Sequence, residues 1–230
     1  MFARYALYFT PTGPLAEVLA DWLGWDPITG TARSHPDLAN LPRPAAELTE
    51  RPRKYGAHAT LKPPFHLATG PDAQDAEALE AAVAAFAATR APVALDGLAI
   101  TRIGSFLALT PVGDTAALSD LAADCVRHFD GFRAPPNADE LARRRQARLS
   151  PTQESNLDTW GYPYVMDDFR FHITLTGPLR RDKIDTTTAA LTAHLTPHLT
   201  APFQIDALSL LGGDRETGRF HMIRRAQLTG

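Results

Sequence analysis

The sequence has almost no cysteine and no surplus of either charge. Its 230 residues include one cysteine, Cys125, which excludes an intrachain disulfide and a thiolate metal cage. The net charge is −3, which argues against a protein whose main task is to coat long nucleic acid, because such binding rests on a basic excess. An anionic substrate must therefore be held by local groups. The helical spacing of Cys125 with Leu118, Leu121 and Phe129 predicts a buried position.

Long apolar runs and targeting signals are also missing. No stretch approaches the length that spans a membrane, and residues 1–5 enter strand-like sequence without a signal-peptide pattern. The chain is 44% hydrophobic and 21% charged, as is typical of a folded globular protein. We expect a cytoplasmic protein without a membrane partner, and the sequence leaves its oligomeric state open.

Periodicity and turn residues predict a mixture of strands and helices. The predicted strands are 4–10, 93–102, 106–110, 203–211 and 219–228, and the predicted helices are 15–22, 71–89, 115–129, 138–148 and 182–199. Another short helix is expected from Ser150 to near Gly161, because Ser150, Pro151 and Gln153 suit the N-cap, N1 and N3 positions. Residues 24–52 are rich in proline and polar residues, which predicts a long irregular segment.

The pattern His-x-Thr occurs four times. His58-Ala59-Thr60 and His172-Ile173-Thr174 lie in strand-like runs, where residues i and i+2 leave the same face. The copies that begin at His194 and His198 lie in a predicted helix, where such residues point in nearly opposite directions. His194 and His198 have the spacing of two zinc ligands, but no catalytic Glu or third ligand accompanies them. We therefore interpret these two histidines as solvated or capping residues.

The surroundings of the first two motifs are repeated. Residues 91–100 match residues 201–210 at an offset of 110, and His58 and His172 are 114 apart. This predicts an internal duplication with the order strand, helix, hairpin in each half, and a pseudo-two-fold that brings the motifs together. The expected fold is α+β, with two antiparallel-sheet lobes, outer helices and a central cleft. We expect one bilobed domain over residues 1–230, with lobes centred on 55–112 and 168–228 and a helical insertion at about 114–162.

Five stretches of the chain resemble one known family. They are Arg4–Phe9, Trp22–Gly24, Tyr55–Lys62, Trp160–Met166 and Phe169–Leu179. Together they resemble the 2H phosphoesterase superfamily, which is named for two His-x-Thr/Ser motifs. Within it, the chain is most similar to the bacterial branch associated with phosphonate metabolism, a domain of unknown function. Ala57 departs from the aromatic residue that Phe171 provides in the second motif.

The resemblance implies that His58, Thr60, His172 and Thr174 form one site for cyclic phosphodiester hydrolysis. A neutral His would take a proton from water, a protonated His would give one to the leaving oxygen, and the threonines would bind the phosphoryl oxygens. The sequence does not decide which His is the base. No metal or cofactor is expected.

The substrate predicted in this way is a small anionic phosphoester, held by local side chains. The candidates for substrate binding are Arg4, Tyr5, Tyr55, Lys62 and Arg170, for each of which a surface position is an equal alternative. The arginines between Arg143 and Arg148 could hold a second phosphate or cap the cleft, but a solvated helical face is favoured.

Three functions remain open. The resemblance favours a ribose 1,2-cyclic phosphate formed during carbon–phosphorus bond cleavage. The second is a 2′,3′-cyclic phosphodiesterase or RNA end-processing enzyme, although the near-neutral charge disfavours long RNA. The third is a non-catalytic protein that binds nucleotides or sugar phosphates.

Overall fold

The centre of the molecule is a seven-stranded antiparallel sheet. The computed structural model describes residues 2–230, and the strand order in this sheet is β11-β10-β1-β4-β8-β7-β6. These strands are β11 (Phe220–Gln227), β10 (Ala207–Asp214), β1 (Phe2–Phe9), β4 (Ala59–Phe65), β8 (Ile173–Thr174), β7 (Phe106–Val112) and β6 (Gly97–Ile103). Two small sheets pair β2 (Trp25–Asp26) with β3 (Thr31–Ala32) and β5 (Val93–Leu95) with β9 (Phe203–Ile205). The predicted α+β class is confirmed.

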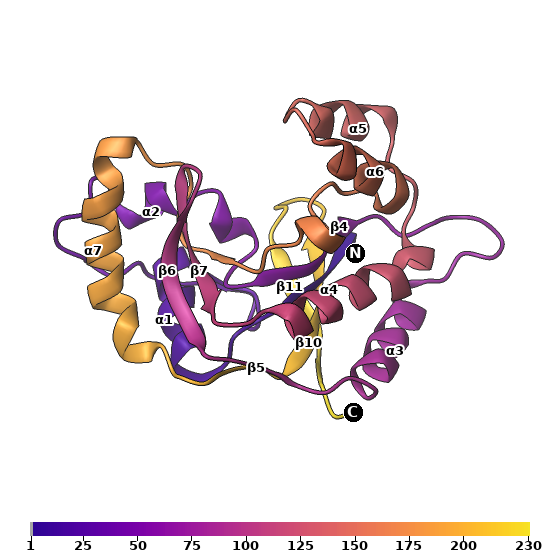
Figure 1. The fold of residues 1–230 in the computed structure, drawn as a ribbon, viewed down its shortest axis with the longest axis horizontal. Coiled ribbons are helices and arrows are strands. Elements are labelled where there is room, and N and C mark those ends of the chain that lie inside the picture. Colours follow the sequence, from indigo (N-terminus) through magenta and orange to yellow (C-terminus); the bar gives the residue numbers. More distant parts are fainter. Residues whose placement is uncertain (1) are drawn as a thin grey trace.

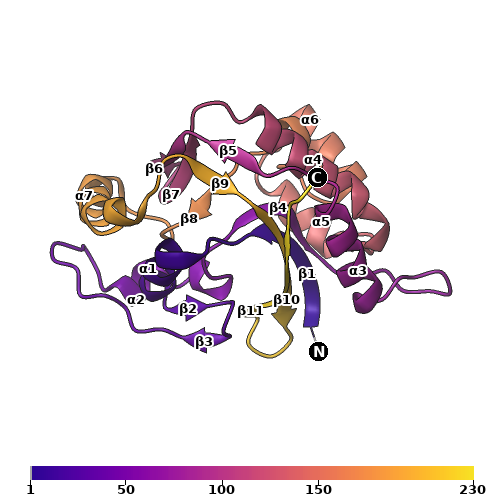
Figure 2. The same cartoon turned by 90° about the horizontal axis from the view of Figure 1, so that it is seen from below.

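The helices pack against one face of the sheet, in two groups toward its opposite ends. Figures 1 and 2 show α1 (Gly13–Leu23) and α7 (Ile184–Leu195) on one side, and α3 (Ala76–Ala87) and α4 (Ala116–His128) on the other. Above α4 in Figure 1 lie α5 (Ala138–Arg145) and α6 (Pro151–Trp160), and α2 (Ala45–Leu48) is a single turn beside α1. The apolar faces of α1, α3, α4 and α7 join one core cluster with the sheet. Within residues 2–230, no helix has the length and apolar character needed to cross a membrane.

Several local predictions are confirmed, and three helices are shorter than predicted. The helix predicted over 71–89 spans Ala76–Ala87, and the one predicted over 138–148 ends at Arg145. Cys125 is fully buried in α4, and Ser150 with Gln153 forms a reciprocal capping box at the start of α6. The helix predicted over 182–199 ends at Leu195 and is followed by the 3-10 turn η5 (Thr196–His198). The cause is Pro197, which has no N–H with which to continue the α-helical hydrogen-bond ladder.

The expectation of two separate sheets is corrected. The hairpin of β6 and β7 joins β8, whereas β10 joins β1, which in turn pairs with β4. Each half of the sequence therefore contributes strands to both ends of one continuous sheet. The two motif-bearing strands, β4 and β8, are neighbours at its middle.

Two strand pairs have the register that a local two-fold axis would produce. Ala59 pairs with Ile173, and these residues are equivalent at the offset of 114. In the small sheet Ala94 pairs with Gln204, which are equivalent at the offset of 110. When equivalent residues of two halves lie directly opposite each other in antiparallel strands, a two-fold axis can pass between them. The duplication stays a prediction, and these registers agree with it.

The strand pairing also indicates a different starting point for the repeat. Tyr8 pairs with Thr60 and Ala108 pairs with Thr174, so β1 and β7 occupy equivalent places at an offset of 100. The same offset aligns the ends of these strands, Thr10-Pro11-Thr12-Gly13 and Thr110-Pro111-Val112-Gly113. Both glycines have positive φ, 64° and 86°. A repeat of strand, helix, motif strand, helix and two strands, starting at β1 and β7, therefore fits the structure.

Candidate active site

The pairing of β4 with β8 places both His-x-Thr motifs on one face of the sheet. Because Ala59 lies opposite Ile173, continuing the antiparallel register puts His58 opposite Thr174 and Thr60 opposite His172. The four polar residues are half-buried, whereas Ala59 and Ile173 between them are fully buried in the core. Directly opposite residues have Cβ atoms about 5 Å apart and diagonal ones are about 7–8 Å apart, which leaves room for a phosphoryl group between the histidines.

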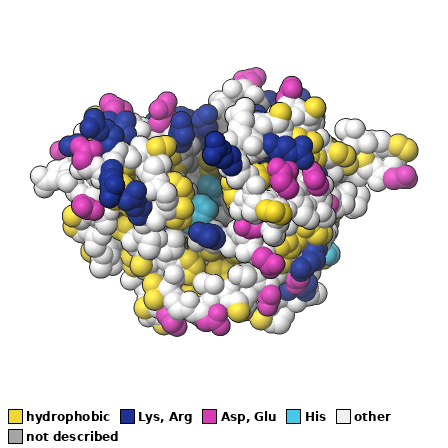
Figure 3. Space-filling view, turned by 45° about the horizontal axis from the view of Figure 1, so that its top comes forward, with side chains coloured by type: hydrophobic (Ala, Val, Ile, Leu, Met, Phe, Trp, Pro, Cys, Tyr) yellow, Lys and Arg dark blue, Asp and Glu magenta, His cyan; other side chains and the backbone are white. Residues whose placement is uncertain are grey.

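A hollow opens on the surface around histidine side chains. Figure 3 shows them at its floor, with Lys and Arg side chains around the rim.

Both histidines lie just before their strands and make the same hydrogen bond. The Nδ1 atom of His58 is 2.9 Å from the carbonyl oxygen of Gly56, and Nδ1 of His172 is 2.8 Å from the carbonyl oxygen of Arg170. A carbonyl oxygen can only accept, so Nδ1 carries the proton in each ring. In the neutral form each Nε2 therefore presents a lone pair, and in the charged form a donated proton.

The two histidines differ in their surroundings. Aromatic rings cover His58, with the ring centroid of Tyr8 at 4.2 Å and that of Tyr55 at 5.3 Å. Burial lowers the pKa of His58 to about 4, the charge of His172 acts in the same direction, and the hydrogen bond to Gly56 opposes both. His58 is therefore neutral at pH 7. The ring centroid of Phe106 lies 6.0 Å from that of His172.

The threonine hydroxyls are available to a ligand. Across residues 2–230, neither Thr60 nor Thr174 makes a side-chain hydrogen bond to another protein group. Each hydroxyl can donate one hydrogen bond. Together with the two Nε2 atoms, the hydroxyls give the site four hydrogen-bonding groups that can contact one small anion.

Three of the predicted substrate contacts lie near the histidines. Tyr55 stacks on Phe220 at 5.0 Å and flanks His58. The guanidinium of Arg4 lies 5.9 Å above the same Phe220 ring, on the site face of the sheet. Arg170 is exposed, and its backbone carbonyl holds His172.

The predictions for Tyr5 and Lys62 are corrected. Tyr5 is buried in the core cluster on the opposite face of β1 from Tyr8. Lys62 does not share the face of Thr60, because a register shift in β4 pairs Lys62 with the core residue Leu7.

The buried ammonium of Lys62 is instead bound at the end of α4. Its Nζ donates to the carbonyl of Val126 at 3.1 Å and to Oδ1 of Asp130 at 3.2 Å. Burial lowers the pKa of Lys62, and Asp130 opposes this effect.

Sequence reasoning missed Tyr8 and Tyr162. Burial raises the pKa of Tyr8, and Tyr55 and Tyr162 lie close enough to add to the effect. The guanidinium carbon of Arg144, in α5, lies 4.6 Å from the Tyr162 ring centroid. The repeat Thr-Pro-x-Gly after β1 and β7 was the available signal for Tyr8, because it aligns β1 with a strand beside the second motif.

The arginines between Arg143 and Arg148 differ in their contacts: two bind other side chains and two are exposed to solvent. Arg145 pairs with Glu154 at 3.0 Å and Asp158 at 2.8 Å, which fastens α5 to α6. Arg143 and Arg148 are exposed, in agreement with a solvated face. Arg144 pairs with Glu140 at 2.7 Å and its guanidinium lies over the ring of Tyr162, so it lies on the side of α5 that faces Tyr162.

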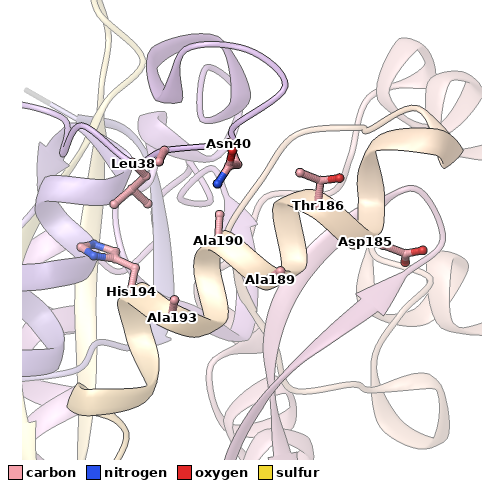
Figure 4. A pocket seen from close by; sticks show the side chains of 9 residues that line it. Leu38, Asn40, Asp185, Thr186, Ala189, Ala190, Ala193 and His194 are labelled. Atoms are coloured by element: carbon pink, nitrogen blue, oxygen red, sulfur yellow. The ribbon is translucent and has the colours of Figure 1, made fainter.

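Another hollow lies along α7, away from the two motifs. It measures about 840 Å³, and Figure 4 shows Ala190, Ala193 and His194 of the helix facing Leu38 and Asn40. His194 lies in α7, and His198 lies in η5. Among residues 2–230, no group of three His, Cys, Asp or Glu side chains is arranged to hold a metal ion.

Comparisons with known proteins give the family. Residues 60–221, more than half of the chain, match the family model described as "Protein of unknown function (DUF1045)". The chain belongs to this family. The match confirms the resemblance to a domain of unknown function that the sequence indicated.

Curated relatives are about twice as long as this chain. Proteins named "Ribose 1,5-bisphosphate phosphokinase PhnN" match from Janthinobacterium sp. (strain Marseille), 39% identical over 90% of this chain, and from Laribacter hongkongensis (strain HLHK9), 30% identical over 96% of it. The chain spans only 47% and 51% of these relatives.

Solved structures resemble the chain more distantly. A phosphoesterase is 15% identical with a TM-score of 0.46, and E. coli LigT complexed with 3′-AMP is 13% identical with a TM-score of 0.47. Each likeness covers 100% of both chains.

Proposed function

We propose that this protein hydrolyses a cyclic phosphodiester of a small sugar phosphate or nucleotide without a metal ion. The observation that carries the proposal is the antiparallel register of β4 and β8, in which His58, Thr60, His172 and Thr174 share one half-buried face. Two proton carriers and two hydroxyl donors on one face suit phosphoryl transfer with general acid–base catalysis.

In the proposed reaction His58 is the general base. Its Nε2 takes a proton from water as the water oxygen forms a bond to phosphorus. The bond from phosphorus to one ring oxygen breaks, and that oxygen receives the proton from Nε2 of His172. The product is a phosphomonoester with a free hydroxyl group, and Thr60 and Thr174 donate to the oxygens on which negative charge develops.

The different environments of the histidines support this assignment. A base must be unprotonated before reaction, and the pKa of His58, about 4, keeps its Nε2 lone pair free at neutral pH. As an acid, His58 would almost never carry the required proton at pH 7. His172, which shares the face with His58, is then the histidine left to act as the acid.

A ribose phosphate is the favoured substrate class. The curated relatives are named for ribose 1,5-bisphosphate, although the chain covers about half of each. The three lysines Lys54, Lys62 and Lys183 follow Arg, Leu and Asp, so this chain holds no Gly-Lys-Ser/Thr loop of the kind that cradles a nucleoside triphosphate. This supports hydrolysis of a ribose 1,2-cyclic phosphate rather than phosphate transfer from a nucleotide.

The test offers the purified chain three substrate classes. Ribose 1,2-cyclic phosphate, 2′,3′-cyclic nucleotides and short RNA are incubated with wild type, His58→Ala and His172→Ala, each with and without chelator, and followed by phosphorus NMR. We expect turnover of the ribose substrate, at least a 10³-fold lower kcat in each variant, and no effect of chelator.

The other possible outcomes would favour a different function or refute the mechanism. Preference for 2′,3′-cyclic nucleotides or RNA ends would favour the second enzyme class. Binding of every substrate without turnover would favour a sugar-phosphate binding protein. Unchanged turnover in either histidine variant would refute the two-histidine mechanism, and loss of activity in chelator would assign the chemistry to a metal.

A further inference from the structure

Tyrosine and arginine side chains gather beside His58 on the face of the sheet that carries the motifs. Tyr8 in β1 pairs with Thr60 in β4, and residues directly opposite each other in antiparallel strands leave the same face. The ring centroid of Tyr8 lies 4.2 Å from that of His58, and the ring of Tyr55 covers the same imidazole at 5.3 Å. These tyrosines therefore adjoin the place where the reacting phosphoryl group binds in the proposed mechanism.

The guanidinium of Arg4 lies on this face too. The register of β1 against β10 is regular from Arg4 to Tyr8, so these two residues, four apart, leave the same side of β1. Arg4 pairs with Gly213, which pairs in turn with Phe220. Because Gly213 has no side chain, the guanidinium reaches across it and lies 5.9 Å from the Phe220 ring centroid. That ring stacks on Tyr55 at 5.0 Å, so continuous contacts join Arg4 to the rings beside the first motif.

The segments α5 and α6 add two more side chains. Tyr162 follows α6, and the guanidinium carbon of Arg144 in α5 lies 4.6 Å from its ring centroid. Burial raises the pKa of Tyr8 and of Tyr162, Tyr55 acts in the same direction on both, and Tyr162 does so on Tyr8. The three phenol groups therefore lie near one another. We refer to Arg4, Tyr8, Tyr55, Arg144 and Tyr162 as the Arg4–Tyr162 cluster.

The phenol groups of the cluster are available to a ligand. Among residues 2–230, the hydroxyls of Tyr8, Tyr55 and Tyr162 make no hydrogen bond to another protein group. The Tyr8 side chain is almost entirely buried, but its hydroxyl is not one of the enclosed polar atoms without a partner, so it opens to solvent. Because the raised pKa of Tyr8 and Tyr162 keeps both protonated at pH 7, each can donate a hydrogen bond.

The positive charge of the cluster is only partly compensated. Arg144 pairs with Glu140 at 2.7 Å, whereas Arg4 forms no ion pair within residues 2–230. A guanidinium binds a phosphate through two parallel N–H···O bonds, and neutral hydroxyls can donate to the remaining oxygens. Figure 3 shows the same preference for anions on the surface, with Lys and Arg side chains around the hollow that contains the histidines.

The second motif lacks the tyrosines of the first at the equivalent places. Tyr8 and Ala108 are equivalent, because they pair with the two motif threonines. At the offset of 114 that relates the two histidines, Phe169 is equivalent to Tyr55, and it packs against the core. Neither Ala108 nor Phe169 has a hydroxyl group. A substrate with a second anionic group would therefore bind in one orientation, with that group on the side of the first motif.

We propose that the Arg4–Tyr162 cluster binds a second phosphoryl group of the substrate. The preferred substrate is then a cyclic phosphodiester that also carries a phosphomonoester, such as a ribose 1,2-cyclic phosphate phosphorylated at O5. Arg4 supplies the uncompensated charge, and the tyrosine hydroxyls donate to the other phosphate oxygens. This inference rests on the proposed function and specifies its substrate.

The test compares the same cyclic substrate with and without the 5-phosphate. In the wild type we expect kcat/KM to be about 10–100-fold higher with the 5-phosphate, mainly through KM. In Arg4→Gln this preference falls toward one, and in Tyr8→Phe and Tyr162→Phe it falls about two- to tenfold. The matched controls Arg181→Gln and Tyr164→Phe alter an exposed arginine and an exposed tyrosine outside the cluster, and they retain the preference.

The ratio between the two substrates distinguishes binding from a structural role. Loss of the contact between Arg4 and Phe220 would by itself lower kcat/KM for both substrates alike and leave their ratio unchanged. Arg4→Lys keeps the charge without the planar guanidinium, so it should retain part of the preference. Equal kcat/KM for the two substrates in the wild type, or a preference that survives in Arg4→Gln, overturns the inference.

A binding measurement separates this inference from the hydrolase proposal. If the wild type hydrolyses no cyclic substrate, the proposed function fails, and calorimetric titration with ribose 5-phosphate and with ribose then tests the cluster alone. We expect ribose 5-phosphate to bind to the wild type and to Arg181→Gln, and at least tenfold more weakly to Arg4→Gln. Absence of binding to the wild type, or binding that is equal for ribose or equal in Arg4→Gln, overturns the inference.

Discussion

The titration of His58 offers the sharpest test of how the site works. Its pKa of about 4, against 6.5 for an unperturbed imidazole, makes protonation about 300-fold less favourable, or ~3 kcal/mol. Tyr55 covers one side of the ring at 5.3 Å. Replacing it by Ala admits water, so we expect the pKa of His58 to rise roughly halfway back, to about 5.

Nitrogen NMR of the imidazoles measures this directly. His58 is assigned by its absence in His58→Asn, and its neutral form should show the proton on Nδ1, as the bond to Gly56 requires. The acidic limb of kcat/KM should follow the same pKa in wild type and Tyr55→Ala. Tyr164→Ala, which removes an exposed tyrosine, is the matched control. It should leave the pKa of His58 and the acidic limb of kcat/KM unchanged.

The same shift makes stability depend on pH with a defined sign. Because the folded-state pKa of His58 lies below its unfolded value, its neutral form contributes stability that is complete above pH 6.5 and is lost as pH falls toward 4. Denaturant unfolding between pH 4 and 7 should show this loss reduced in Tyr55→Ala. A folded wild type in which His58 titrates between pH 6 and 7 would refute the assignment of His58 as the buried base.

Three substitutions test the surroundings. Gly56→Ala should lower the free energy of unfolding by about 1–3 kcal/mol and also lower kcat, because Gly56 has φ of 69° and its added Cβ would clash with the ring of Pro27. Gly218→Ala, with similar φ and open space, should cost less in denaturant unfolding and spare kcat. Thr174→Val should lower kcat about 10²–10³-fold at unchanged melting temperature, and a normal kcat would remove the hydroxyl from catalysis. Lys62→Met should cost about 1–3 kcal/mol, since it leaves the Val126 carbonyl unpaired, with KM within about twofold; a large rise in KM would contradict its position outside the site.

Local sequence patterns were sufficient to predict most helices and strands. They also predicted that the His and Thr of each motif lie on the same face of a strand. Alternation in a strand puts His58 with Thr60, and His172 with Thr174, on one face whatever the rest of the chain does. The capping box at Ser150 and the buried Cys125 also follow from neighbours within a few residues. These features were predictable because their physical causes are local.

The corrected predictions share a different cause. The position of Lys62 depends on a register shift against β1, and the burial of Tyr5 depends on which face of β1 the core covers. The order of the strands in the sheet, with β7 beside β8 and β1 beside β10, depends on pairings between residues about 60 to 210 apart in the sequence. None of these leaves a trace in the residues immediately around it.

The sequence alone determined which residues could carry protons and bind a phosphoryl group, because side-chain chemistry and strand alternation are local properties. The tertiary structure decided that β4 and β8 are neighbours and that the rings of Tyr8 and Tyr55 cover His58. The physical reason is that desolvation, strand pairing and cavities arise from groups brought together by folding. Those contacts give the histidines of two similar motifs different surroundings.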